Sequence, residues 1–131
     1  MSLYFVVQTK TLFMKSLNLT AKDVEKVKKA AALISSSLEN HHTIVEVAKA
    51  VQLPEKRLKY AFKQLMGHGL YGYLQLQRME KAKALMLEGE KIKHIVPKVG
   101  YANEANFSKA FKKVYKELPT QWRKGVLAKT G

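Results

Sequence analysis

The chain has 131 residues, no cysteine and a formal net charge of +14, with 24 Lys and Arg against 10 Asp and Glu. Its length suits one average domain or two very small ones, and the lack of cysteine excludes a disulfide framework, a thiolate nucleophile and a cysteine-ligated zinc site. No window approaches the roughly 18 consecutive apolar residues of a membrane-spanning helix, so we expect a cytoplasmic protein with no membrane partner.

Residues 1 to 19 open the chain with a run of β-branched and aromatic side chains. A lone strand there would have no partner strand, so we interpret this segment as a connector or as the remnant of an upstream domain. Thr20 and Asp23 then resemble a capping box, and apolar residues recur at helical spacing through about Asn40. The spacing predicts one amphipathic helix.

A short helix and a longer helix are predicted next. Thr43 can cap the short helix, whose apolar residues end at Val51. Pro54 lacks an amide donor, so it can begin the longer helix but cannot continue it, and Gly67 can end that helix.

The second half of the chain repeats this order after one long helix. Residues 71 to 89 predict the long helix, which Gly89 closes. A short helix starts near Ile92, Gly100 allows the turn, and Asn103 can cap the helix that follows. The chain is therefore predicted to be all-α, with about seven helices.

Apolar residues of the two halves correspond closely when the chain is compared with itself. Each half consists of a short helix, a turn and a longer helix, which is the helix-turn-helix arrangement. A plain helical bundle with internal symmetry would give the same spacing. At a shift of 48 residues the pairs are Ile44 with Ile92, Val47 with Ile95, Ala48 with Val96, Val51 with Val99 and, more loosely, Leu53 with Tyr101, and at a shift of 49 they are Leu58 with Phe107, Phe62 with Phe111 and Tyr73 with Trp122.

The positive charge is concentrated in the repeated part. Residues 1 to 48 carry a net charge of +2, so the other +12 lies in residues 49 to 131. Such an excess of one sign favours a polyanionic partner such as nucleic acid, although a basic surface can also serve solubility.

Helical geometry places polar and basic residues opposite the apolar face of both longer helices. Lys can bind phosphate or guanine, Asn can bind adenine, Glu can accept from cytosine, and Ala can contact the thymine methyl group. These residues are Lys56, Lys59, Tyr60 and Lys63 in the first unit and Glu104, Ala105, Asn106, Lys109, Lys112 and Lys113 in the second. Both faces therefore suit double-stranded DNA.

Residues 44 to 123 resemble the DNA-binding domain of the AraC/XylS family of bacterial transcription regulators. The most specific part of the resemblance is the stretch from Gly100 to Lys113, with Pro119 and Arg123 after it. The resemblance implies two helix-turn-helix subdomains joined by a long linker helix. The implied domain covers residues 20–131, divided into a first unit (20–70), the linker helix (71–89) and a second unit (90–131).

The resemblance also implies a function and particular contacts. It implies sequence-specific binding of double-stranded DNA that regulates bacterial transcription, with two recognition helices in successive major grooves roughly 34 Å apart. The implied base-contacting residues are Lys56, Lys59 and Tyr60 in the first unit and Glu104, Ala105, Asn106 and Lys109 in the second, while the backbone near Thr43 contacts phosphate. RNA polymerase is an expected partner, and an effector or dimerisation domain is expected outside this chain.

Four residues depart from the family pattern. Pro54 replaces a capping Ser or Thr, and Lys116 and Leu118 replace a common Gly and Thr before Pro119. Pro97 lies within the short helix of the second unit, where it removes an amide donor. If Pro97 distorts that unit, we expect the first unit to supply most of the base readout.

One alternative function stays open on the sequence alone. A helical protein-interaction module, with incidental charge or only non-specific nucleic-acid binding, would use residues 21 to 40 and the apolar N-terminal run. No enzyme is expected, because no constellation of catalytic residues is present. No cofactor and no metal are expected, because His41 and His42 are adjacent and so do not share a helix face, and His68 and His94 have no acidic or His partner at i+3 or i+4.

Overall fold

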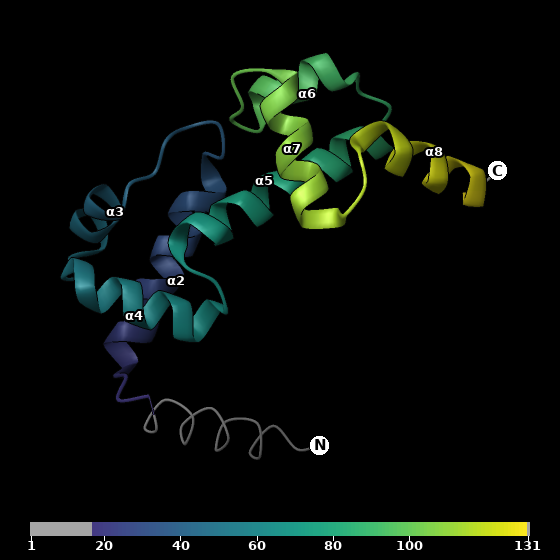
Figure 1. Cartoon of the computed structure of the whole chain (residues 1–131). Helices are drawn as coiled ribbons and strands as arrows, with labels where there is room; N and C mark the ends of the chain where they lie inside the picture. The colour runs from purple at the N-terminus through teal and green to yellow at the C-terminus, as the bar shows by residue number, and fades with distance from the viewer. Residues whose placement is uncertain (1–16, 131) are drawn as a thin grey trace, which may run out of the picture. The chain divides into compact units, whose positions relative to one another are not determined.

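The computed structural model describes residues 17–130, which contain seven helices and no strand (Figure 1). The helices are α2 (Ala21–Ser36), α3 (Ile44–Val51), α4 (Glu55–Met66), α5 (Leu70–Leu87), α6 (Ile92–Lys98), α7 (Glu104–Tyr115) and α8 (Pro119–Thr130). The predicted all-α fold is confirmed. Most of the expected connector, residues 1–16, lies outside the described residues.

The described residues form two compact units. The first consists of residues 17–34 and 42–70, and the second consists of residues 35–41 and 71–130. Helix α3 packs against α4 in the first unit, while α6 packs against α7 and α7 against α8 in the second. Helices α4 and α7 both have 12 residues and begin 49 residues apart. The duplication seen in the sequence is therefore also a duplication of structure.

The predicted helix caps are confirmed by hydrogen bonds. The Thr20 amide donates to Asp23 Oδ2 at 2.9 Å, and the Asp23 amide donates to Thr20 Oγ1 at 3.1 Å, which completes the capping box. Thr43 Oγ1 accepts from the Glu46 amide at 3.2 Å. Pro54 precedes α4 without a side-chain cap, as expected.

The first unit buries the apolar residues that the helical spacing selects. Leu58, Ala61 and Phe62 of α4 have no exposed surface. The buried residues contributed by α2 and α3 are Val27, Ala30, Ala31, Ile34, Val47, Ala48 and Val51. Because one side of α4 is buried in this way, the opposite side faces solvent.

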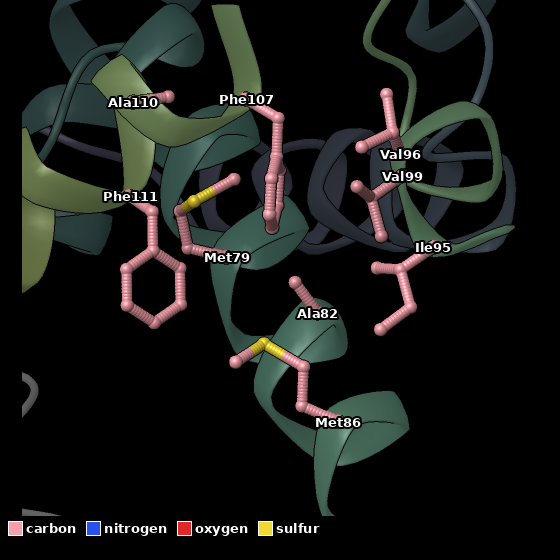
Figure 2. Packing of buried hydrophobic residues seen from close by; sticks show 9 residues of the cluster. All are labelled: Met79, Ala82, Met86, Ile95, Val96, Val99, Phe107, Ala110 and Phe111. Atoms are coloured by element: carbon pink, nitrogen blue, oxygen red, sulfur yellow. The ribbon is translucent and has the colours of Figure 1, made fainter. Parts of the chain in front are cut away.

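The core of the second unit is built from α5, α6 and α7 (Figure 2). Phe107 and Phe111 of α7 are fully buried, and the indole of Trp122 in α8 meets the ring of Phe111 with 6.0 Å between centroids. The cluster comprises Met79, Ala82, Met86, Ile95, Val96, Val99, Phe107, Ala110 and Phe111. This packing fixes which side of α7 is exposed.

Helix α2 is shorter than the sequence predicts. It ends at Ser36 rather than near Asn40. Arg78 of α5 donates from Nε to the carbonyl of Leu38 at 2.8 Å and from Nη2 to the carbonyl of Asn40 at 3.0 Å. Leu38 is still buried, but its carbonyl is bound by a distant side chain, which local spacing cannot reveal.

Pro97 is accommodated within α6 without loss of the local core. Helix α6 ends at Lys98 and has seven residues, one fewer than α3. Ile95, Val96 and Val99 are buried, and the Val99 amide donates to the carbonyl of Ile95 at 3.1 Å. The proline therefore coincides with a slightly shorter helix that packs as its counterpart does.

Candidate nucleic-acid interface

The eleven residues predicted from the sequence are all exposed to solvent. Thr43 is the N-cap of α3, and the others lie on α4 or α7. Those on α4 are Lys56, Lys59, Tyr60 and Lys63, and those on α7 are Glu104, Ala105, Asn106, Lys109, Lys112 and Lys113. Each unit thus presents its own polar helix face.

The exposed face of α4 is strongly basic. Lys56, Lys59 and Lys63 are exposed, while Leu58 and Phe62 on the other side of the helix have no exposed surface. Flexible ammonium groups on a rigid helix can bind phosphate oxygens or guanine acceptors.

The side chains of Tyr60 and Arg57 on α4 are bound by the first turn of α2 and by the residues just before it. Tyr60 donates its hydroxyl hydrogen to the carbonyl of Leu17 at 2.8 Å. Arg57 forms an ion pair with Asp23, with 2.6 Å between Nη2 and Oδ2, and also donates to the carbonyl of Asn18. Sequence reasoning missed both interactions, because the partners lie 34 to 43 residues apart in the chain.

The Asp23 carboxylate is buried and charged. Its side chain is 9% exposed, and the hydrogen bond from Arg57, opposed by burial, lowers the pKa of Asp23 below its ordinary value of 3.8. Hydrogen bonds from Thr20 lower this pKa further. Because Asp23 also caps α2, one carboxylate joins the start of α2 to α4.

The exposed face of α7 has more chemical variety. Asn103 Oδ1 accepts from the Asn106 amide at 2.8 Å, as the predicted cap requires, and this bond fixes the start of the helix. Within residues 17–130, the side chains of Asn106 and Lys109 make no hydrogen bond or ion pair. These two side chains are therefore free to bind an external partner.

Two other kinds of site are absent from the part of the chain that the structure describes. No three His, Asp or Glu side chains gather there in a way that could hold a metal ion. None of the helices there has the length and apolar character needed to cross a membrane. The two basic helix faces stay the strongest candidates.

Two consecutive short-and-long helix pairs with exposed polar faces define a double helix-turn-helix protein. A model of the helix-turn-helix domain family matches residues 47–125, which is more than half of the chain. The chain belongs to this family, in its AraC-type branch.

Individual relatives agree with this assignment. The arabinose operon regulatory protein of Salmonella typhimurium is 31% identical over 102 residues, a match that covers 76% of this chain and 36% of the relative. The C-terminal domain of AraT, a response regulator from Geobacillus stearothermophilus, superimposes with a TM-score of 0.71 at 31% identity and covers 76% of this chain and 84% of that one.

A more distant structure shares the fold. The DNA-binding domain of AdpA, solved with a target DNA, superimposes with a TM-score of 0.72 at 15% identity and covers 79% of this chain and 94% of that one. The chain spans about a third of the length of the curated relatives that it matches.

Proposed function

We propose that this chain binds double-stranded DNA in a sequence-specific manner and regulates bacterial transcription. The observation that carries the proposal is the duplicated helix-turn-helix, in which the second helix of each unit, α4 or α7, has an exposed polar face. The names of the relatives, an arabinose operon regulatory protein and a response regulator, agree with this function. These relatives are regulators and not enzymes, and we propose no catalytic activity for this chain.

The proposed contacts follow from the exposed faces. Helices α4 and α7 would enter successive major grooves, where Lys56 and Lys59 of α4 and the start of α7 contact base edges. Backbone amides near Thr43 would bind phosphate, as donors at a helix start do. The remaining proposed contacts are Tyr60, Lys63, Glu104, Ala105, Asn106, Lys109, Lys112 and Lys113.

The wider biological setting is proposed on the same grounds. We propose a cytoplasmic regulator that also contacts RNA polymerase and has an effector or dimerisation domain outside this chain. The greater length of the relatives supports the additional domain. The division into residues 20–70, 71–89 and 90–131 stays a prediction about how the domain is organised.

Binding of a labelled DNA duplex at several salt concentrations tests the proposed function. Each neutralised phosphate contributes about 0.9 to the slope of log affinity against log salt, so several contacts give a slope of several units. A flat response would reject nucleic acid as the partner. It would favour the alternative, a helical protein-interaction module with incidental charge.

A further inference from the structure

Equivalent positions on α4 and α7 carry different side chains with different partners. The shift of 49 residues that relates α4 to α7 pairs Arg57 with Asn106 and Tyr60 with Lys109. At 100° per residue, Tyr60 and Lys109 lie opposite the core, and Arg57 and Asn106 lie about 60° to one side of them. The two units therefore present the same positions with different side chains.

In the first unit both positions are occupied by intramolecular partners. Arg57 is paired with the carboxylate of Asp23 and the carbonyl of Asn18, and Tyr60 donates to the carbonyl of Leu17. To bind DNA, Arg57 would have to leave a buried carboxylate that then lacks its partner, which is costly. In the second unit the equivalent Asn106 and Lys109 have no competing side-chain partner within residues 17–130.

We infer that Asp23, together with the backbone of Leu17 and Asn18, withholds one side of the first recognition helix from DNA, so that Asn106 and Lys109 of the second unit carry most of the base selectivity. The inference rests on the proposed function. Asp23 is a positioning residue in it, because it acts through Arg57 and does not itself touch DNA.

The first unit then has a different role, and Tyr60, which exposure alone made a proposed DNA contact, is no longer one of its contacts. Its free lysines, Lys56, Lys59 and Lys63, bind phosphates or single guanine acceptors, which gives affinity with little discrimination. This reverses the expectation drawn from Pro97, because α6 keeps its buried residues while α4 has a side that is already occupied.

Releasing Arg57 should change the sequence that the first unit prefers. Asp23→Asn removes the negative charge and keeps an oxygen that can accept from the Thr20 amide. A freed guanidinium can bind guanine through O6 and N7, which discriminates roughly tenfold or more against the wrong base. The variant should therefore gain a guanine preference at one position of the first unit's half-site.

Selection of bound sequences from randomised duplexes measures this preference. The parent, Asp23→Asn and the matched control Glu25→Gln would be compared, since Glu25 is an exposed carboxylate on the same helix that does not touch Arg57. Asn106→Ala identifies the block that the second unit reads. The double variant Asp23→Asn, Arg57→Ala tests whether any gain passes through Arg57, and a thermal melt verifies that each variant is folded.

The parent is expected to select one well-defined block, which Asn106→Ala weakens, and one poorly defined block. Asp23→Asn should add a guanine preference at one position of the poorly defined block, while Glu25→Gln and the double variant should leave that block unchanged. Two equally defined blocks in the parent, or a folded Asp23→Asn with an unchanged profile, would overturn the inference and leave DNA binding intact. No selected sequence and a flat salt response would instead reject the proposed function.

Discussion

Lys116 occupies in the second unit the position that Gly67 occupies in the first. Both residues follow a helix of 12 residues, and both have a left-handed backbone, with φ of 67° at Lys116 and 81° at Gly67. Each amide closes the helix by donating to the carbonyl four residues earlier. The same turn is thus made once by glycine and once by a residue with a side chain.

Replacing Lys116 with glycine should stabilise the second unit. A residue with a Cβ atom in the left-handed region costs about 1 kcal/mol, which glycine avoids. We expect Lys116→Gly to raise the free energy of unfolding by up to about 1 kcal/mol, measured by denaturant titration. Lys116→Ala is the control and should bring no gain, and an equal gain from alanine would show that the side chain, not the backbone, is responsible.

Gly100 should tolerate a side chain far less well than Gly89. Both have a left-handed φ, of 88° and 89°, but a Cβ atom on Gly100 would lie 2.6 Å from the carbonyl oxygen of Leu38 and from the guanidinium of Arg78. Nothing lies within 4 Å of a Cβ atom on Gly89. Gly89→Ala should cost about 1 kcal/mol of unfolding free energy.

Gly100→Ala should cost a further 1 to 3 kcal/mol, roughly the penalty of overpacking, because the carbonyl of Leu38 belongs to the backbone and cannot simply rotate away. Chemical denaturation of both variants measures the difference. Equal losses at the two glycines would mean that residues 35–41 move aside without penalty.

The helices and their buried faces could be predicted from the sequence because they depend on local spacing. Leu58 and Phe62 mark the buried side of α4, and the caps at Thr43 and Asn103 depend on residues three positions apart. The hydrogen bonds of Arg57 and Tyr60 could not be predicted, because the sequence around a long polar side chain does not indicate which distant carbonyl or carboxylate it will contact.

The carboxylate of Asp23, which is paired with Arg57, should make the stability of the protein depend on pH. Arg57 is the chief cause of the lowered pKa of Asp23 in the folded protein. The contribution of this ion pair to the free energy of unfolding is therefore complete above the ordinary pKa of 3.8 and is lost as pH falls through the lower folded pKa. We expect Asp23→Asn to lower the Tm at neutral pH, and the difference from the parent to shrink below pH 3.8. A difference in Tm that is constant with pH would argue against a charged, paired Asp23.

Lys109 and Lys113 should have different roles in DNA binding. Lys109→Ala should lose discrimination at particular base pairs, because that side chain lies on the proposed reading side of α7. Lys113→Ala should weaken all sequences alike and lower the salt slope by about 1, as expected for a phosphate contact. Affinities for a selected duplex and a scrambled duplex separate the two effects. An equal loss of affinity for both duplexes in Lys109→Ala would mean that Lys109 contacts only phosphate.

The spacing of the two half-sites shows whether α4 and α7 enter successive major grooves of one duplex, as proposed. One helical turn of DNA has about 10 base pairs, so inserting five between the selected blocks turns one block to the opposite face. If α4 and α7 do so, affinity for the lengthened duplex falls to that of a duplex with a single block. Unchanged affinity after the insertion would contradict this proposal.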